Sequence, residues 1–591
     1  MPGRRTSSVA SAAEPRRAAD PEATEGAGGV VKVSDVVAEA LARAGTTHLF
    51  GLAGSTMLAI LDSVDERTDI SYVSVRHEQS AASMADGYAR VTGKPGVFVT
   101  HSGPAVLNTA MAVACAYKDS VPLVAFSTTE SQHTAGREGW HEVDTAAVFK
   151  PIVKWSAKVE QPEQIGRVLR NAFQIAVGGR PGPVQVELPD NVSMAAVSDS
   201  VLDELRGLEG DCGRGVRTPR FRPLPDPALV ERVAELIRRA ERPLILLGGG
   251  AAWSEAHDEV RELVELLGVP VVTTYQGRGV LPDSHPQNLS YVVRGHLAPW
   301  LGGYVAFEAM RESDFVLGLG ARFSDISTRN WTAIDPKATI VQVDIDDRQI
   351  GFQYPVTLGV QADVREFVQA LTVAMHEKQP DVACFRTRAE QLRAQYEAEL
   401  GSYFVYDKIR PEIQAQQVIE ELGRLVDRET TLVLGTGRHT HHANKLRVER
   451  PRAYVTSVSL GTMGQAFPAA IGAALAQPDK PVLCLVGDGD YAMVMAELET
   501  AVREQASVTT VIFNDFGYGA VKMWQAQTFD GRTPGVDHGN PDFGAVAERF
   551  GARGYTVDDP KELGPTLRAA LADRTASVVD VRVDRDTYQV R

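Results

Sequence analysis

The chain has little of what marks secreted, membrane-bound or metal-cluster proteins. Its 591 residues include only four cysteines, at positions 115, 212, 384 and 484, which lie far apart with no paired spacing. This argues against a disulfide framework and against a zinc site, and it favours a reducing compartment. No uninterrupted apolar run approaches the ~18 residues that a membrane span requires. We therefore expect a cytoplasmic protein with no membrane partner.

An excess of basic residues is also lacking. The chain has 61 Lys and Arg against 76 Asp and Glu, a net charge of −15, which argues against a general nucleic-acid or anionic membrane surface. Hydrophobic residues (44%) and charged residues (23%) occur at ordinary globular levels. Near the start, Arg4-Arg5 is followed by Ser, Ala, Glu and Pro instead of the apolar run of an export signal, so residues 1–30 are predicted to form a disordered tail.

What the chain does contain is a strongly patterned segment, residues 481–524. An apolar run ends at Gly487-Asp488-Gly489-Asp490, a helical pattern of apolar residues follows, and a second apolar run ends at Asn514-Asp515-Phe516-Gly517. This order predicts a βαβ unit of a parallel sheet, in which both strand ends and the helix N-terminus share one edge. Two carboxylates suit a hard divalent cation there, and free N–H groups suit a phosphate. The pattern thus indicates a metal–diphosphate cradle, although an isolated Gly-Asp-Gly is more often a plain turn.

The segment resembles the motif of thiamine diphosphate (ThDP) enzymes, Gly-Asp-Gly followed after a helix by an Asn-Asn or Asn-Asp pair. The resemblance implies Mg²⁺ ligands at Asp488, Asp515 and the main-chain carbonyl of Gly517. Asp stands at 515 where Asn is commoner, which leaves Asn514 as an alternative ligand. Cofactor contacts are implied along the whole motif, at Gly487, Asp488, Gly489, Asp490, Asp515, Gly517 and Tyr518.

A second acid, Glu78, lies where an apolar strand pattern (Tyr72, Val73, Val75) runs into an Ala-rich helix. That junction is at the carboxyl edge of a parallel sheet, where ligands bind. Taken alone, Glu78 would be an ordinary helix-start carboxylate. However, Arg-His-Glu-Gln at 76–79 and Met-Ala-Asp-Gly-Tyr-Ala-Arg at 84–90 resemble the ThDP-enzyme segment whose Glu contacts N1′ of the aminopyrimidine. The resemblance, which continues at 100–104, 119–123 and 178–189 toward acetolactate synthase and its relatives, implies that Glu78 binds the cofactor and acts in catalysis.

The domain organisation predicted is α/β, with three doubly wound parallel-sheet domains of the ThDP-enzyme type. We expect a pyrimidine-binding domain at 31–197, a linker at 198–226, a central α/β domain at 227–375, a charged helical connector at 376–410, and a diphosphate- and Mg²⁺-binding domain at 411–591. Four strands are predicted in the central domain, the last at 340–345. In acetolactate synthases this domain holds a non-redox FAD, and the matching positions here are Arg180, Gly249, Gly250, Thr274, Arg322, Asp344 and Asp363. The Met-His-Gly stretch of that family is not evident around 291–303.

In the third domain, a strand at 431–435 ends at Thr436-Gly437-Arg438-His439. Because a helical metal site would space its ligands by three or four, we interpret the crowded His439, His441 and His442 as part of a carboxyl-edge loop. The resemblance places diphosphate contacts at Gly437, Arg438 and His439, with Arg in place of the usual Gln. Residues 459–464 resemble the loop that grips the cofactor rings at Gly461 and Met463. By packing alone Met463 would be core filler, whereas the resemblance makes it a wedge between the rings.

The resemblance implies ThDP- and Mg²⁺-dependent decarboxylation of a 2-oxo acid such as pyruvate, with transfer of the acyl carbanion to a carbonyl acceptor. Glu78 and Asp488 of one site would come from different subunits of a homodimer or homotetramer, and a regulatory subunit is a further candidate partner. FAD is a candidate cofactor. The alternatives are a 2-oxo-acid decarboxylase, a specialised carboligase of a biosynthetic pathway, and a family member without catalysis.

Three stretches depart from acetolactate synthases. Gly51 to Thr56 (GLAGST) replaces GYPGGA, Gly139 to Glu142 (GWHE) replaces Ala-Phe-Gln-Glu, and Gly519 to Trp524 (GAVKMW) keeps only the Gly, the Val and the Trp of Gly-Met-Val-x-Gln-Trp. A histidine at 141 titrates near neutral pH and could protonate the alkoxide formed at the acceptor. We therefore predict a catalytic role for His141, the alternative being a surface-loop histidine with no role, and the acceptor itself is left open.

Overall fold

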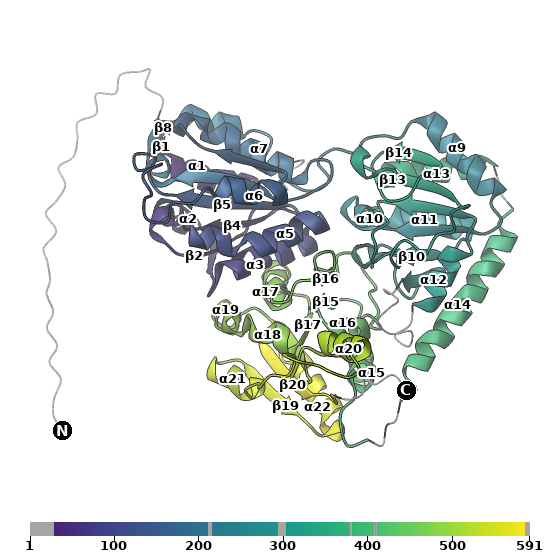
Figure 1. The fold of residues 1–591 in the computed structure, drawn as a ribbon. Helices are drawn as coiled ribbons and strands as arrows, with labels where there is room; N and C mark the ends of the chain where they lie inside the picture. The colour runs from purple at the N-terminus through teal and green to yellow at the C-terminus, as the bar shows by residue number, and fades with distance from the viewer. Residues whose placement is uncertain are drawn as a thin grey trace, which may run out of the picture.

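The computed structural model describes residues 29–210, 215–292, 303–378, 381–406, 408 and 410–585. It contains three six-stranded parallel sheets, each covered by helices on both faces, which confirms the predicted fold (Figure 1). The expected N-terminal tail lies outside the described residues except for Gly29 and Val30. No helix of the described chain is long and apolar enough to cross a membrane.

The first sheet has the strand order β3-β2-β4-β5-β7-β6. Its central strands read as nearly continuous apolar runs, as expected when helices bury both faces of a parallel sheet. The strand order reverses between β2 and β4, which opens a crevice at their carboxyl ends. The strands are β2 (His48–Leu52), β3 (Ser71–Ser74), β4 (Gly96–Thr100), β5 (Leu123–Thr129), β6 (Trp155–Lys158) and β7 (Val184–Pro189).

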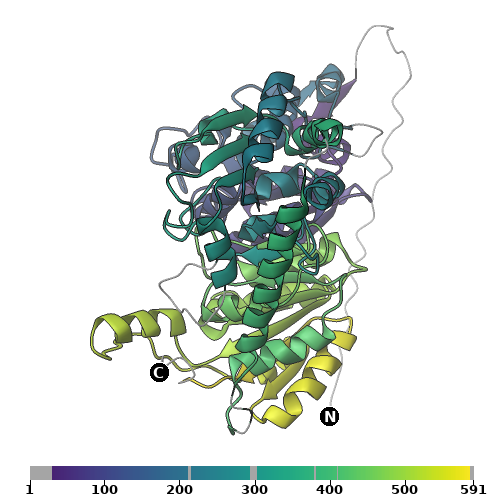
Figure 2. The same ribbon diagram turned by 90° about the vertical axis from the view of Figure 1, so that its right-hand side faces the viewer.

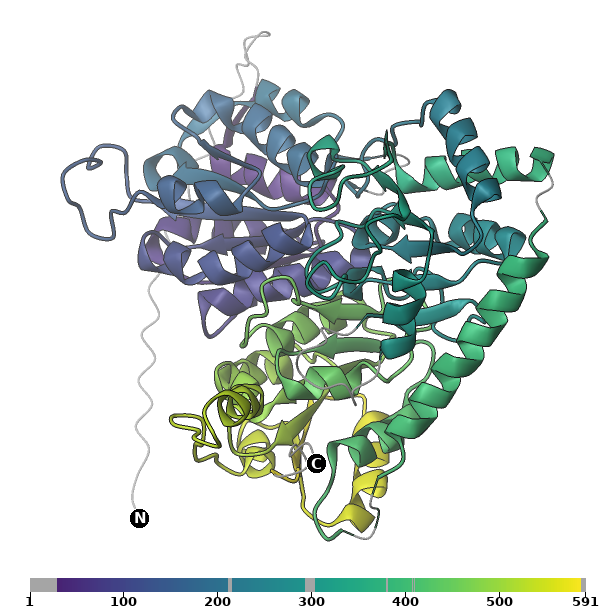
Figure 3. The ribbon, with the colours of Figure 1, turned by 45° about the vertical axis from the view of Figure 1, so that its right-hand side comes forward.

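Helices on both faces of this sheet include α3, which begins at Glu78 after an N-cap at His77 and ends at Gly93 in the left-handed region. The others are α1 (Val33–Arg43), α2 (Leu58–Asp65), α4 (Pro104–Asn108), α5 (Ala110–Asp119), α6 (Thr145–Phe149) and α7 (Ile165–Val177), with α3 spanning Glu78–Thr92. A short antiparallel pair, β1 (Val30–Lys32) with β8 (Ala196–Ser198), joins the two ends of the domain. The loop between β5 and α6 projects from the domain (Figure 3).

The central sheet has the order β11-β10-β9-β12-β13-β14. The four predicted strands are present as β9 (Pro243–Leu247), β10 (Val271–Thr273), β12 (Phe315–Leu319) and β13 (Thr339–Asp344). The prediction that the fourth is the last strand is wrong, because β14 (Leu358–Gln361) follows it, and β11 (Asn288–Tyr291) was missed. Both are four-residue edge strands, too short to give a clear apolar run. The helices are α9 (Pro227–Arg239), α10 (Gly249–Trp253), α11 (His257–Leu267), α12 (Tyr304–Arg311) and α13 (Val364–Lys378).

The third sheet has the order β16-β15-β17-β18-β20-β19. Its strands are β15 (Thr431–Leu434), β16 (Tyr454–Thr456), β17 (Val482–Gly487), β18 (Val508–Asn514), β19 (Arg553–Val557) and β20 (Ser577–Arg582). Its helices are α15 (Ala415–Leu425), α16 (Arg438–Ala443), α17 (Ala466–Ala476), α18 (Asp488–Ala492), α19 (Leu498–Arg503), α20 (Gly519–Thr528), α21 (Phe543–Arg549) and α22 (Pro560–Ala572). Helix α20 stands away from the sheet (Figure 2).

Two features connect the third domain to the other two, namely helix α14 (Ala383–Tyr403) and the crossing of helices α3 and α17. The expected connector is helical, as α14, and runs from the central to the third domain (Figure 3). Helices α3 and α17 cross with their backbones in contact, because glycines stand at the crossing: a Cβ on Gly87 would lie 2.0 Å from the Ala469 carbonyl oxygen, and one on Gly472 would lie 2.0 Å from that of Met84. The crossing places the start of α3, which contains Glu78, against the third domain.

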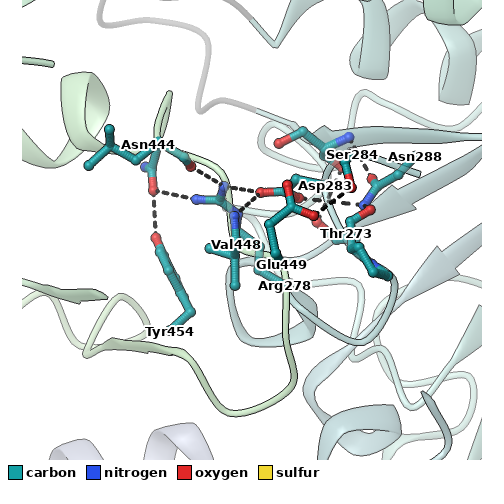
Figure 4. Close-up of polar contacts among 12 residues, drawn as sticks. Thr273, Arg278, Asp283, Ser284, Asn288, Asn444, Val448, Glu449 and Tyr454 are labelled. Carbon is teal, nitrogen blue, oxygen red and sulfur yellow. Dashed lines mark hydrogen bonds and ion pairs between the residues drawn. The ribbon is translucent and has the colours of Figure 1, made fainter. Parts of the chain in front are cut away.

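A buried ion pair also joins the central and third domains (Figure 4). Arg278 is paired with Asp283, and it donates to the carbonyl of Leu446 at 2.8 Å and to Asn444 at 3.4 Å. The third domain also contacts the acid of the pair, since the Val448 N–H donates to the Asp283 carboxylate at 2.9 Å. Because both charges are buried and each also hydrogen-bonds to the third domain, the pair helps to fix how the two domains meet.

Candidate functional site

A cavity of about 270 Å³ opens at the carboxyl edge of the third sheet, where β17 and β18 end. Almost every residue predicted to bind a cofactor through the third domain lines it. The lining comprises Thr436, Gly437, Arg438, His439, Gly461, Met463, Gly487, Asp488, Gly489, Asp490, Phe513, Asp515, Gly517, Tyr518, Gly519, Ala520, Val521 and Trp524. Segments that are far apart in the sequence thus meet at one edge, as parallel strand ends do.

Asp488 and Asp515 both face this cavity. Asp488 begins α18 directly after β17, and its Oδ2 accepts from the Gly517 N–H at 3.2 Å and from Asn540 Nδ2 at 2.6 Å, while His538 Nε2 lies at 3.3 Å. These contacts all use one oxygen of the carboxylate. Burial, and then the charge of Asp488, raise the pKa of Asp515 to about 7. A cation bound between the two side chains would relieve the repulsion that Asp488 exerts on the Asp515 carboxylate.

Asn514 lies on the other side of the strand end. It is fully buried, donates to Asp580 at 2.8 Å and accepts from Asn540 at 2.9 Å and from the Phe516 N–H at 3.3 Å. Asn514 does not line the cavity, whereas Asp515 does. The alternation of side chains at the end of β18 therefore favours Asp515 over Asn514 as the second acidic ligand.

The crossover after β17 is more broken than the apolar pattern indicated. Instead of one helix, α18 is followed by a 3₁₀ turn (Met495–Glu497) and then by α19. The interruption gives Glu497 a buried position from which its carboxylate accepts the N–H groups of Arg76 and His77 at 3.0 and 3.1 Å. The crossover thereby holds the junction that precedes Glu78, a contact that no sequence pattern signalled.

The prediction of a loop at His439, His441 and His442 is wrong, because these residues lie on the short helix α16. Gly437 is its N-cap, in an extended conformation that lets the chain turn from strand to helix at once. Burial lowers the pKa of His439 to about 3, so this side chain is neutral near pH 7. Arg438 reaches across the cavity mouth to donate to the Gly519 carbonyl at 3.2 Å.

Asp490, which follows β17, contacts two other loops, the one at residues 459–464 and the one after β15. Its carboxylate accepts the N–H groups of Gly464 at 2.5 Å and Thr436 at 2.9 Å, while burial raises its pKa to about 6. Met463 lines the cavity next to this contact, where it faces space and is not core filler. Asp490 thus holds two wall segments of the cavity in place.

Glu78 is not among the residues that line this cavity. Its Oε2 accepts from Asn108 Nδ2 at 2.9 Å, on the crevice between β2 and β4. The next residue, Gln79, does reach the third domain and donates to the Gly464 carbonyl at 3.0 Å. Glu78 therefore lies at the edge of the first sheet, and the carboxylate pair lies at the edge of the third.

His141 lies in the loop after β5, at a second cavity of about 250 Å³ that Ser102, Glu130 and Lys158 also line. Its ring is 3.0 Å from that of His101 and 3.9 Å from the Glu130 carboxylate, measured from Nδ1. Within the described residues, His101, Glu130 and His141 are the one group of three whose spacing could also suit a metal ion. Trp140, beside it, is 81% exposed.

A third cleft lies between the first and central domains. All seven positions matched to the FAD of acetolactate synthases line it: Arg180, Gly249, Gly250, Thr274, Arg322, Asp344 and Asp363. Gly250 allows the floor of the cleft to close, since a Cβ there would lie 2.7 Å from Gly320 Cα. Asp344 ends β13, and burial raises its pKa to about 6. The residues around 293–302, where the family's Met-His-Gly stretch was sought, lie outside the described chain.

The chain was compared with known families and proteins. It matches three family descriptions: thiamine pyrophosphate (ThDP) enzyme, N-terminal TPP binding domain over residues 31–148, central domain over 230–371, and C-terminal TPP binding domain over 435–581. The central match contains the whole second sheet, and the other two matches each cover most strands of the first and third sheets.

Relatives align over nearly the full length. The acetolactate synthase isozyme 3 large subunit of Escherichia coli is 32% identical over 563 residues, 93% of this chain and 94% of that protein. The acetolactate synthase large subunit of Corynebacterium glutamicum is 33% identical over 583 residues, 96% and 88% of the two chains. A probable acetolactate synthase large subunit of Methanococcus aeolicus is 32% identical over 549 residues, 91% and 89%.

Proposed function

Because the chain belongs to the ThDP-dependent enzymes and is related over its whole length to acetolactate synthase large subunits, we propose that it decarboxylates a 2-oxo acid and transfers the acyl unit to a carbonyl acceptor. The observation that carries the proposal is the convergence of Asp488, Asp515 and the glycine-rich turns on one cavity. Pyruvate is the donor that the relatives' names favour.

The cavity suits a diphosphate with a divalent cation. Its walls are glycine backbone: a Cβ on Gly489 would lie 2.6 Å from the Tyr518 ring, and one on Gly519 would lie 2.4 Å from the Asp515 carboxylate. A divalent cation would offset the repulsion between the two carboxylates, which raises the proton affinity of Asp515. Asp488, Asp515 and the Gly517 carbonyl would hold Mg²⁺, and Gly437, Arg438 and neutral His439 would contact the diphosphate.

When bound, ThDP supplies the carbanion chemistry at its thiazolium ring, and the protein supplies geometry and protonation. Met463 would press the rings together, with Gly461 leaving room beside it. Glu78 would hydrogen-bond N1′ of the aminopyrimidine and so fix the protonation state of that ring. Asn108 keeps the Glu78 carboxylate oriented through the 2.9 Å contact to Oε2.

A complete site requires Glu78 and the carboxylate pair together, yet Glu78 stands outside the cavity of its own chain. We propose that a second copy brings its Glu78 to this cavity, as part of a homodimer or homotetramer. The apolar side chains that line the cavity and are left exposed, Tyr518, Val521 and Trp524, are consistent with cover by another subunit. A regulatory subunit remains a separate candidate partner.

We also propose that the cleft between the first and central domains binds FAD. Arg180 and Arg322 are the cationic groups that line the cleft and are available to a diphosphate, and Asp344 at the end of β13 is an acid available to a ribose hydroxyl. Equilibrium dialysis with FAD, comparing the native chain with Gly250→Leu, tests this assignment. Retention of FAD by the variant, in which the side chain would fill the cleft floor, would refute it.

The function is tested with a panel of 2-oxo acids offered to protein loaded with ThDP and Mg²⁺. We expect CO₂ release from at least one donor, and a ligated product when an aldehyde or second 2-oxo acid is present. Product identification separates a carboligase from a decarboxylase, which would release free aldehyde only. No CO₂ from any donor, with ThDP bound, would instead indicate a family member without catalysis.

A further inference from the structure

Two of the stretches in which this chain departs from acetolactate synthases meet in space through a residue that the sequence did not single out. Thr56 belongs to the first stretch and His141 to the second. His101, directly after β4, lies between them: its Nδ1 is 2.8 Å from Thr56 Oγ1, and its Nε2 is 3.0 Å from His141 Nδ1. The departures therefore form one cluster.

The backbone is built to allow this contact. A Cβ on Gly54 would lie 2.5 Å from the His101 side chain, and a Cβ on Gly103 would lie 2.4 Å from the His141 carbonyl oxygen. His141 itself has a φ of 63°, in the left-handed region, which costs a non-glycine residue on the order of 1 kcal/mol. Among the non-glycine residues that line the cavity, His141 is the one with a positive φ, and such strain points to a function for its side chain.

The hydroxyl chain behind His101 fixes the position of its proton. Thr128 Oγ1 donates to the Thr100 carbonyl at 2.8 Å, and Thr56 Oγ1 lies 2.5 Å from Thr128 Oγ1. These contacts and the Thr56–His101 contact are all satisfied only if Thr56 donates to Thr128 and His101 Nδ1–H donates to Thr56. This leaves out one longer contact, from the Thr56 N–H to Nδ1 at 3.4 Å.

The same logic extends to His141. With its proton on Nδ1, neutral His101 presents a lone pair at Nε2, so the 3.0 Å contact requires His141 to donate its Nδ1–H. Burial lowers the pKa of His101, which keeps it in this accepting form. Nε2 of His141 has no hydrogen-bond partner among the described residues, and His141 lines the cavity.

We propose that His101 is a positioning residue that fixes the orientation and protonation of His141, so that Nε2 is the nitrogen that exchanges a proton with the acceptor. The proposal rests on the proposed carboligase function for its chemical outcome. Protonated His141 keeps Nδ1–H on His101 and gives its Nε2 proton to the alkoxide oxygen of the new carbon–carbon product, which returns His141 to the neutral form.

The charged groups around the pair come from several elements. Glu130 follows β5, its carboxylate lies 3.9 Å from His141 Nδ1, and it accepts a hydrogen bond from Ser102 Oγ at 2.8 Å. The charge of Glu78, at the start of α3, acts to raise the pKa of His101 and so partly offsets the effect of burial. The remaining charged residues that line the cavity are Glu142, Asp144, Lys158 and Glu187.

The test uses the full chain loaded with ThDP and Mg²⁺ and measures ligated product per CO₂ released. His101→Leu removes the acceptor for Nδ1–H, and we expect the ratio to fall about tenfold while CO₂ release is kept. His101→Gln restores an acceptor oxygen near the position of Nε2 and should recover most of the ratio. Thr56→Val removes only the hydroxyl behind His101, and its ratio of ligated product to CO₂ should lie between those of His101→Leu and the native chain. His133→Leu, an exposed histidine of the same loop, is the matched control.

A measurement that does not depend on activity accompanies it. Nitrogen NMR of deuterated protein labelled with ¹⁵N-histidine reads the tautomer, and neutral His141 should carry its proton on Nδ1 in the native chain but not in His101→Leu. An unchanged ratio in His101→Leu, a Gln variant as poor as Leu, or a proton on Nε2 of His141 would each overturn the proposal. So would one equivalent of transition metal that is bound by the native chain and lost in His101→Leu. If no donor releases CO₂, the proposed function fails while the NMR result still decides the role of His101.

Discussion

At the residue scale, Asp488 carries the metal assignment. Asp488→Asn keeps the shape of the side chain but halves the charge of the acid pair, so the diphosphate would lose its counter-charge. We expect ThDP affinity in the presence of Mg²⁺ to fall by more than the ~10–100-fold that loss of an outer-shell partner costs. Titration calorimetry measures it, with Asp537→Asn, an exposed acid paired with Lys522 at 2.8 Å, as the control. Native affinity in Asp488→Asn would remove Asp488 from the metal site.

Glu78→Gln tests the acid–base assignment. The amide still hydrogen-bonds N1′ but cannot share a proton with it, so ThDP binding should change only a few-fold. Exchange of the C2 proton of the bound cofactor for deuterium should slow by about 10²-fold or more, since general acid–base groups contribute factors of this size. Rapid-quench NMR follows the exchange. An exchange rate equal to that of the native chain would move the acid–base role to another residue.

Single residues were predictable where a motif fixes both chemistry and spacing. Asp488 and Asp515 follow from two strand ends joined by one crossover, and the structure places both at one cavity. His101 was not predictable, because its partners Thr56 and His141 lie 45 and 40 positions away along the chain. Glu497 was missed for the same reason, being 421 positions from the backbone it holds.

At the element scale, the crossing of α3 and α17 depends on glycine. Gly87→Ala would put a methyl group 2.0 Å from a carbonyl oxygen of the facing helix, and the overpacking should destabilise the fold by roughly 1–3 kcal/mol or more. Gly423→Ala on α15 is the matched control, since its Cβ meets only open space and a leucine methyl at 3.9 Å, and it should stabilise by about 0.5–1 kcal/mol. Urea denaturation reports both. Equal stability of the two variants would contradict the close crossing.

We predict that Asp344, at the end of β13, makes the stability of the fold depend on pH. Burial raises the pKa of Asp344 from 3.8 to about 6, so the folded chain holds one proton more than the unfolded chain between these values. Stability therefore falls as pH rises through this window, by about 2–3 kcal/mol in total. Asp344→Asn has no such proton and should match the native chain below pH 4 but exceed it at pH 7. Flavin-free protein is measured by thermal unfolding, with exposed Asp347→Asn as control; a gap independent of pH would refute the cause.

Elements were predicted well where apolar runs are long and poorly where they are short. The buried strands β17 and β18 were located almost to the residue, because they are continuous apolar runs closed by polar turns. Helix α16 was predicted to be a loop from the spacing of its histidines, although His439 and His442 are three positions apart, which a helix also allows. The edge strands β11 and β14 gave no clear signal, because four residues with mixed polarity satisfy neither a strand nor a helix period.

At the scale of the whole molecule, the resemblance to ThDP enzymes predicted three α/β domains, but it did not predict the contacts by which the domains meet. That arrangement depends on contacts such as the buried Arg278–Asp283 pair, whose partners in the third domain lie more than 150 positions away. At this scale, too, we propose that one active site combines Glu78 of one copy with Asp488 of another.

Mixing two inactive variants tests this claim directly. Glu78→Gln and Asp488→Ala are refolded together, so that mixed dimers contain one site with both lesions and one site with neither. Random pairing then restores about a quarter of the native carboligase activity, because about half of the dimers are mixed and each has one intact site of two. Each variant refolded alone stays inactive. If the mixture stays inactive although native mass spectrometry shows mixed dimers, both residues act within one chain and the shared site is contradicted.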